Sequence, residues 1–172
     1  MAKLSPETQE RIRSLKDHYP QRRSAVMPAL QEAQAELGYL ADDTLHEVAA
    51  LLEVPPNMTF EVVSFYSMFD REKKGKYQLQ VCRNLGCALQ GSLKMIEYLE
   101  QKLGIKRGET TPDGRFTLLA VECLGACGWS PMMMIDGKYY EFLDRAGVDA
   151  ILDALKEDKT PPGGPYTAEH VR

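Results

Sequence analysis

Apolar residues in the N-terminal part of the chain recur every three or four positions, which is the spacing of one face of a helix. The pattern predicts a first helix over about residues 6–18, with Ser5 as its N-cap and Pro6 as its first residue. A second helix is predicted over residues 24–37, and Gly38 is expected to end it. Both helices carry an aliphatic stripe, so their inward faces should pack together.

Two further helices are predicted before residue 70. Asp42 and Asp43 can cap the third, and a pair of prolines ends it. The segment 57–69 suits a strand or a helix, and we interpret it as a buried amphipathic helix. Its expected inward face consists of Met58, Val62, Phe65 and Phe69. The four helices would form a small antiparallel bundle, an N-terminal domain over residues 1–74.

The hydrophobic period changes after the charged turn that closes this bundle. Residues 77–81 alternate between apolar side chains and glutamine, as a half-buried strand does. The elements predicted from there are a strand ending at Cys82, a helix over about 92–103 with Leu93, Ile96, Leu99 and Leu103 inward, a strand over 116–122, a hairpin of 132–136 and 138–142, and a closing helix around 148–155.

This order, β-α-β-β-α, predicts a second domain over residues 75–158 and an α+β fold for the whole chain. A right-handed crossover would make the first two strands parallel and bring their exit loops to the same edge of the sheet. The tail, residues 159–172, has no core-forming pattern and is expected to be extended or disordered.

Four cysteines lie in those two exit loops. Cys82 and Cys87 form a Cys-x4-Cys pair, and Cys123 and Cys127 form a Cys-x3-Cys pair. Thiolates that bind one metal lie roughly 3.7 Å apart, a gap that such short loops can close. Two pairs that serve two irons give the ligand set of a [2Fe-2S] cluster.

Other interpretations of the cysteines stay open at this point. A structural zinc site is the main alternative, and a thiol–disulfide couple is weaker because no Cys-x-x-Cys is present. His18, His46 and His170 lie far from the pairs in sequence, and we do not expect them to be ligands.

A cluster also needs backbone N–H groups near sulfur and an apolar cover. Close backbone approach could come from Gly86, Gly125 and Gly128. The cover could come from Leu85, Leu89, Leu124 and Trp129. Ordinary loop glycines and core leucines are an equally good interpretation of these residues.

Charge and composition narrow the class of protein. The net charge of −4 and the scattered lysines and arginines give no electrostatic footprint for nucleic acid or anionic lipid, so a protein partner is expected. We find no apolar run long enough to span a bilayer and no signal sequence, which favours a bacterial cytoplasmic protein. Cytosolic thiols are kept reduced, so metal or redox chemistry is favoured over structural disulfides.

The motifs that carry a family resemblance are Tyr19-Pro20 with Arg23, Gly38-Tyr39, Ser64-Phe65-Tyr66-Ser67-Met68-Phe69 and Val121-Glu122-Cys123-Leu124-Gly125-Ala126-Cys127. With the cysteine spacing, they make the chain resemble the thioredoxin-like [2Fe-2S] E subunit of bacterial respiratory complex I, the NADH:quinone oxidoreductase. The resemblance covers nearly the whole chain.

The resemblance implies one [2Fe-2S] cluster, with Cys82 and Cys87 on one iron and Cys123 and Cys127 on the other, in a thioredoxin-like domain after a helical region. It implies a partner flavin subunit that binds FMN and NADH, so this chain would exchange single electrons with flavin within the peripheral arm. The chain would then lie on the cytoplasmic face of the membrane without inserting into it.

Three points remain expectations. Pro131 stands where thioredoxin folds often place a cis-proline, so Ser130-Pro131 is a candidate cis peptide. The same subunit type resembles electron-input modules of NAD-linked hydrogenases and formate dehydrogenases, and the sequence does not separate these assemblies. A zinc-stabilised scaffold without redox chemistry is the alternative of a different class.

Overall fold

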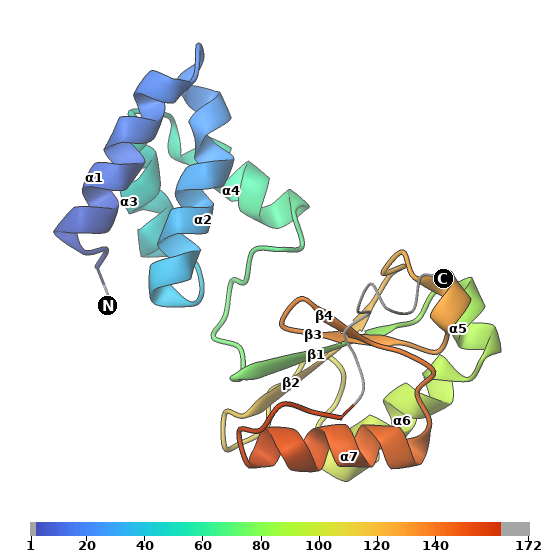
Figure 1. The fold of residues 1–172 in the computed structure, drawn as a ribbon. Coiled ribbons are helices and arrows are strands. Elements are labelled where there is room, and N and C mark those ends of the chain that lie inside the picture. Colours follow the sequence, from blue (N-terminus) through green and yellow to red (C-terminus); the bar gives the residue numbers. More distant parts are fainter. Residues whose placement is uncertain (1–2, 163–172) are drawn as a thin grey trace. The chain divides into compact units, whose positions relative to one another are not determined.

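The computed structural model describes residues 3–162, and the chain divides into two compact units, Met1–Lys73 and a second that begins at Lys74. Helices make up the first unit, and a sheet with helices makes up the second (Figure 1). The fold class is therefore α+β, as predicted. The predicted tail falls mostly outside the described residues.

Four helices build the first unit: α1 (Pro6–Ser14), α2 (Val26–Leu37), α3 (Asp42–Leu52) and α4 (Pro56–Phe65). The first helix is shorter than predicted because the chain tightens into a 3-10 turn over Leu15–His18. Another 3-10 turn, Arg22–Ala25, precedes α2, so this helix begins two residues later than predicted. Ala41 occupies the N-cap of α3. The two aspartates predicted as caps lie in the first turn, where negative charge interacts favourably with the helix dipole.

Aliphatic side chains from all four helices form the core of this unit. Its fully buried members include Ile12, Leu30, Leu40, Leu45 and Leu52. Each buried side chain of this size contributes about 1.5–3 kcal/mol through the hydrophobic effect. Burial of this stripe therefore supplies the main driving force for assembly of the bundle.

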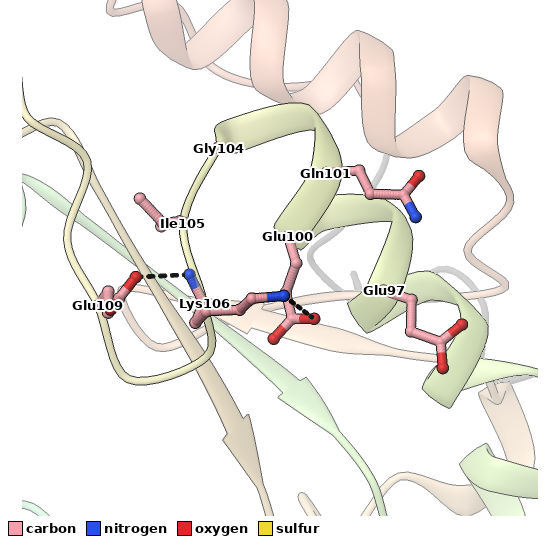
Figure 2. Close-up of a pocket in the computed structure, with 7 residues that line it drawn as sticks. All are labelled: Glu97, Glu100, Gln101, Gly104, Ile105, Lys106 and Glu109. Atoms are coloured by element: carbon pink, nitrogen blue, oxygen red, sulfur yellow. Dashed lines mark hydrogen bonds and ion pairs between the residues drawn. The ribbon is translucent and has the colours of Figure 1, made fainter.

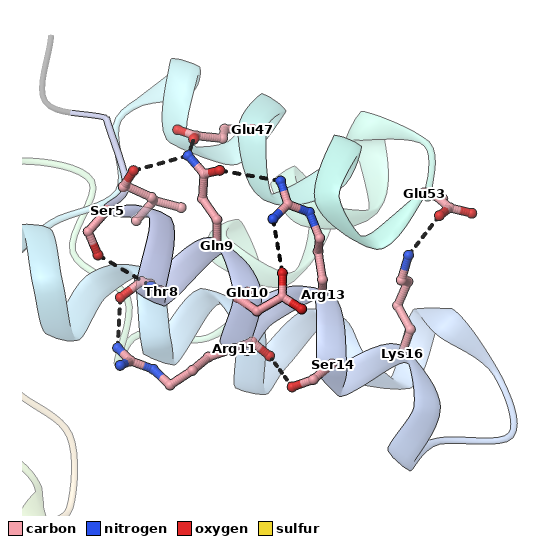
Figure 3. A network of polar contacts seen from close by, with 11 residues as sticks. Ser5, Thr8, Gln9, Glu10, Arg11, Arg13, Ser14, Lys16, Glu47 and Glu53 are labelled. Atoms are coloured by element: carbon pink, nitrogen blue, oxygen red, sulfur yellow. Dashed lines mark hydrogen bonds and ion pairs between the residues drawn. The ribbon is translucent and has the colours of Figure 1, made fainter.

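Polar contacts tie α1 to α3 at the surface of this unit (Figure 3). The Gln9 Nε2 atom donates to Glu47 Oε1 at 3.0 Å and to the Leu4 carbonyl at 3.1 Å. Lys16 Nζ lies 2.7 Å from Glu53 Oε1. Exposed ion pairs of this kind contribute at most about 1 kcal/mol each, so they refine the packing of α1 and do not determine it.

The face predicted for α4 is confirmed in part, because Met58 and Val62 pack partly buried against the core and Phe69 is buried beyond the helix end. Thr59 and Val63 point inward, and the Thr59 hydroxyl donates to the Leu45 carbonyl at 3.1 Å. Phe65, predicted to be buried, is 80% exposed, and Met68 is exposed beyond the helix end. The prediction was wrong for Phe65, because the helix ends at this residue and the chain leaves in extended conformation at Tyr66, so the segment does not continue one helical stripe.

A four-stranded sheet in the order β2-β1-β3-β4 forms the centre of the second unit. Its elements are β1 (Tyr77–Cys82), α5 (Leu85–Leu89), α6 (Ser92–Leu103), β2 (Phe116–Val121), β3 (Met133–Ile135), β4 (Lys138–Tyr140) and α7 (Arg145–Lys156). The predicted β-α-β-β-α order is confirmed, with α5 as an additional short helix. Five residues are too few to show a helical period, so sequence reasoning missed it.

The strand pairing sets the position of the two exit loops. β1 pairs in parallel with β2, and Cys82 is in register with Val121 at the ends of the two strands. β3 runs antiparallel to β1, with Met133 opposite Val81. Both exit loops therefore begin at the same edge of the sheet, as the predicted crossover required.

Helices α6 and α7 lie on one side of this sheet (Figure 1). Their buried residues Ile96, Leu99 and Leu152 belong to one apolar cluster with Leu79 of β1. Leu93, predicted to face inward with Ile96, is instead exposed, and Ser92 is buried beside it. The inward face of α6 therefore begins at Ser92 and continues through Met95, Ile96 and Leu99, and Leu93 lies outside it.

Asp158, just beyond α7, ties this helix end to the start of the sheet. Its Oδ1 atom lies 2.8 Å from Lys76 Nζ and 2.6 Å from Arg115 Nη1, and it accepts the Tyr77 hydroxyl at 2.9 Å. The hydrogen bond from Lys76, followed by those from Arg115 and Tyr77, lowers the pKa of this carboxyl well below its usual range. Because the pKa of Asp158 is lower in the folded than in the unfolded protein, the ionised carboxyl stabilises the fold at pH values above the pKa of the unfolded state. This stabilisation is lost as the pH falls toward the pKa of the folded state.

Replacing Asp158 with asparagine is expected to lower the free energy of unfolding at pH 7 and to reduce its loss between pH 7 and pH 3. Asparagine suits the positive φ of 57° at this position, so the backbone should be undisturbed. Urea unfolding at the two pH values measures both effects. Asp153→Asn, on the solvent side of α7, is the matched control. An equal loss with acid in wild type and Asp158→Asn would contradict this role.

Candidate metal centre

The four cysteines come from both exit loops of the parallel strand pair. Cys82 is the last residue of β1, and Cys87 lies in α5. Cys123 follows β2, and Cys127 begins a 3-10 turn, Cys127–Trp129. The structure brings these loops together, because the ideal Cβ position at Gly86 in the first loop lies 3.8 Å from Cys127 Cβ in the second.

Within each loop the two thiols are neighbours. The Cys123 and Cys127 sulfurs lie 3.6 Å apart, close to the separation of two thiolates on one metal ion. The pKa of Cys127 is raised first by its hydrogen bond to Cys123, and Cys87 and Cys82 raise it further through their charges. A thiol of one pair therefore interacts electrostatically with both thiols of the other.

The two pairs differ in their access to solvent. Cys82 and Cys87 are 2% and 1% exposed, whereas Cys123 and Cys127 are exposed. Burial raises the pKa of the Cys82 thiol, and backbone N–H groups of Asn84 and Leu124 oppose this by donating to its sulfur. A buried thiolate needs such donors or a metal, so the environment of Cys82 fits a ligand better than a free thiol.

Backbone donors reach the second pair as well. The Gly125 N–H donates to Cys123 Sγ at 3.3 Å, and Gly125 has a φ of +81°, a conformation that other residues rarely adopt. The other two glycines are less constrained. A side chain at Gly86 would make ordinary contacts, and one at Gly128 would meet open space.

The apolar cover is only partly as predicted. Leu124 and Trp129 pack against the cluster of buried residues that contains Cys82, Cys87 and Met132. Leu85 and Leu89 do not cover the site, since their side chains are 70% and 78% exposed. Both lie on the short helix α5, which buries Cys87 and turns these leucines toward solvent.

Sequence reasoning missed three residues of the site. Met132 is buried beneath the first pair, and the Tyr139 hydroxyl donates to the Leu124 carbonyl at 2.9 Å. Ser130 lies between the pairs, within 3.4 Å of Cys87 Sγ. Only the topology places them here, because the sequence pattern of Met132 and Tyr139 is that of ordinary strand residues. The peptide Ser130-Pro131, a candidate from the sequence, is cis.

The donor set matches a two-iron centre. Such a centre requires two thiolates for each iron, and the cysteines are placed as two adjacent pairs. Among residues 3–162, no three His, Cys, Asp or Glu side chains are grouped as a site for one metal ion. His18 and His46 lie in the helical unit, and the His46 ring packs at 5.3 Å from Phe60. His170 lies outside the described residues.

A separate hollow at the C-terminal end of α6 has no thiol in its lining (Figure 2). In this hollow Lys106 Nζ lies 3.9 Å from Glu100 Oε2, and the backbone N–H of Lys106 donates to Glu109 Oε2 at 2.7 Å. These contacts stabilise the loop that follows α6. Within residues 3–162, no helix is both long and apolar enough to span a bilayer.

Two thiol pairs at one edge of a sheet, with N–H donors to sulfur, fit the class of iron–sulfur electron-transfer proteins. The chain matches the family model of the thioredoxin-like [2Fe-2S] ferredoxins over residues 12–156 and belongs to that family. Its cofactor is a [2Fe-2S] cluster.

Relatives cover most of the chain. It is 46% identical over 147 residues to an E subunit of the NADH-quinone oxidoreductase of Rhizobium meliloti, an alignment that covers 86% of this chain and 88% of the relative. It is 41% identical over 149 residues to the E subunit of the NADH-quinone oxidoreductase of Aquifex aeolicus, covering 87% and 91%.

Among solved structures, the NAD+-reducing [NiFe]-hydrogenase in its air-oxidised state is similar in fold. The TM-score is 0.67 at 23% identity, over 77% of this chain and 23% of the hydrogenase chain. This likeness supports the fold assignment alone.

Proposed function

We propose that this chain is the E subunit of an NADH:quinone oxidoreductase and transfers single electrons through one [2Fe-2S] cluster. Cys82 and Cys87 would bind one iron, and Cys123 and Cys127 the other. The observation that carries this proposal is the meeting of the two thiol pairs at one sheet edge. The relatives named as E subunits of that enzyme, at 41% and 46% identity over most of the chain, support the parent enzyme.

Different residues of the chain would stabilise the cluster, shield it from water and leave it accessible for electron exchange. When bound, the cluster supplies a one-electron acceptor, whereas NADH delivers two electrons together as hydride. The N–H groups of Asn84, Leu124 and Gly125 point at sulfur and would stabilise negative charge there. Met132 and Trp129 would keep water from the buried pair, and the exposed pair would leave a side open for electron exchange.

The partner in this proposal is the flavin subunit, which would bind FMN and NADH. The chain would exchange electrons with that flavin and belong to the peripheral arm, on the cytoplasmic face of the bacterial membrane. The proposed domains are a helical domain, residues 1–74, and a cluster domain, residues 75–158.

Spectroscopy of the anaerobically purified chain tests the cluster. We expect visible absorption from iron–sulfur charge transfer, two irons and two sulfides per chain, and an EPR signal that appears only after reduction with dithionite. Zinc analysis runs on the same sample. A colourless protein with one zinc ion per chain would overturn the electron-transfer function in favour of a scaffold.

Co-purification from the native host tests the parent assembly. A tagged chain should retrieve a flavin subunit together with the quinone-reducing membrane arm. Retrieval of a hydrogenase or a formate dehydrogenase in their place would refute the assignment to NADH:quinone oxidoreductase and leave the cluster chemistry intact.

A further inference from the structure

Ser130 connects the two cysteine pairs through a single hydroxyl group. Its Oγ atom lies 3.4 Å from Cys87 Sγ in the first loop. The same hydroxyl donates to the backbone carbonyl of Cys127 in the second loop at 2.8 Å. It therefore interacts with a ligand of one pair and with the backbone that positions a ligand of the other.

The backbone around Ser130 is fixed on both sides. The Trp129 carbonyl accepts the Phe142 N–H at 3.0 Å, and the Pro131 carbonyl accepts the Leu143 N–H at 2.9 Å. Ser130 itself is half-buried. These bonds hold the hydroxyl beside Cys87, so its distance to the sulfur is set by the fold and not by a mobile loop.

Iron binds cysteine as the thiolate, so the direction of the Ser130–Cys87 bond would be reversed in the cluster-loaded protein. In the thiol form, Cys87 S–H donates to Ser130 Oγ while the serine proton goes to the Cys127 carbonyl. A Cys87 thiolate has no proton to donate and becomes an acceptor. Rotation of the serine hydroxyl then lets its proton face the sulfur, and a charge-assisted bond is stronger than one to a neutral carbonyl.

We propose that Ser130 is a positioning residue that raises the reduction potential of the [2Fe-2S] cluster by donating its hydroxyl proton to Cys87 sulfur. The inference rests on the proposed ligand set. Reduction adds negative charge that is shared by the thiolate ligands, so this hydrogen bond is stronger in the reduced state than in the oxidised state. Hydrogen bonds to the sulfurs are among the factors that set cluster potentials.

The test compares Ser130→Ala with Ser130→Thr in the full chain, by redox titration followed by EPR. We expect Ser130→Ala to lower the equilibrium constant for reduction of the cluster about tenfold. For a one-electron couple this corresponds to a reduction potential about 59 mV lower. Threonine keeps the hydroxyl and should stay near the wild-type value. Ser64→Ala, an exposed serine of the helical unit, controls for serine replacement as such.

An unchanged potential in Ser130→Ala with full iron and sulfide content would overturn the proposal, as would equal shifts in the alanine and threonine variants. If Ser130→Ala does not bind a cluster, the hydrogen bond can still be tested in the wild-type protein. On brief transfer to D2O, the hydroxyl exchanges at once, and an iron–cysteine stretching band should shift in resonance Raman spectra in wild type and Ser130→Thr. Absence of that shift would refute the hydrogen bond.

These outcomes differ from failure of the proposed function. A wild-type chain that contains zinc, or no iron, refutes the electron-transfer role before any serine variant is made. An intact cluster whose potential ignores position 130 refutes the role of Ser130 alone.

Discussion

Replacing Cys82 with alanine is expected to abolish binding of the [2Fe-2S] cluster. Cys82 ends strand β1, is 2% exposed, and receives N–H groups from both exit loops, so alanine removes a sulfur around which the site is built. Visible absorption and the EPR signal of the reduced protein should fall to background. Iron and sulfide analysis of the anaerobically purified variant measures the loss.

The control for this prediction is Leu85→Ala. Leu85 lies between the two cysteines of the first pair, and its side chain is largely exposed, so its removal should leave the cluster content unchanged. Circular dichroism of both variants would show that the sheet is retained. Full iron and sulfide content in Cys82→Ala would remove Cys82 from the ligand set.

Replacing Leu79 with alanine is expected to lower the free energy of unfolding by about 2–5 kcal/mol. Leu79 is fully buried in β1, between β2 and β3, and belongs to the apolar cluster that α6 and α7 form against the sheet. Truncation leaves a cavity that the surrounding strands cannot fill without breaking their register. Urea unfolding followed by far-UV circular dichroism measures the change.

Leu89→Ala provides the matched comparison, since it removes the same atoms from a side chain that is 78% exposed. Its effect should stay within about 0.5 kcal/mol, as for other surface substitutions. Comparable destabilisation of the two variants would mean that Leu89 is covered in solution, and would contradict the exposure of α5.

Elements with a clear period were predictable from the sequence. The alternation of Tyr77, Leu79 and Val81 identified β1, and the Asp136-Gly137 turn identified the hairpin of β3 and β4. Local signals suffice for these elements. Successive side chains along a strand point to opposite faces of the sheet, and a tight turn accepts only a few residue types.

Errors arose where a face, and not an element, had to be predicted. Phe65 and Leu93 lie on helices that were expected, yet both are exposed. Apolar spacing shows that a helix has an inward face, but it does not fix which residue of the first or last turn is buried: at the start of α6 the polar Ser92 is buried and Leu93 is exposed. Which residue is buried there is decided by the packed unit.

The sequence by itself determined the kinds of elements, their order, and the two cysteine pairs that make a metal or redox centre the favoured chemistry. These features depend on residues close together along the chain. The tertiary structure alone decided that Cys82 and Cys87 are buried while Cys123 and Cys127 are exposed, and that Ser130 lies between the pairs. The Ser130–Cys87 contact joins residues 43 positions apart. The parallel pairing of β1 with β2 brings the two cysteine loops to the same edge of the sheet, and the antiparallel pairing of β3 with β1 places Ser130 there.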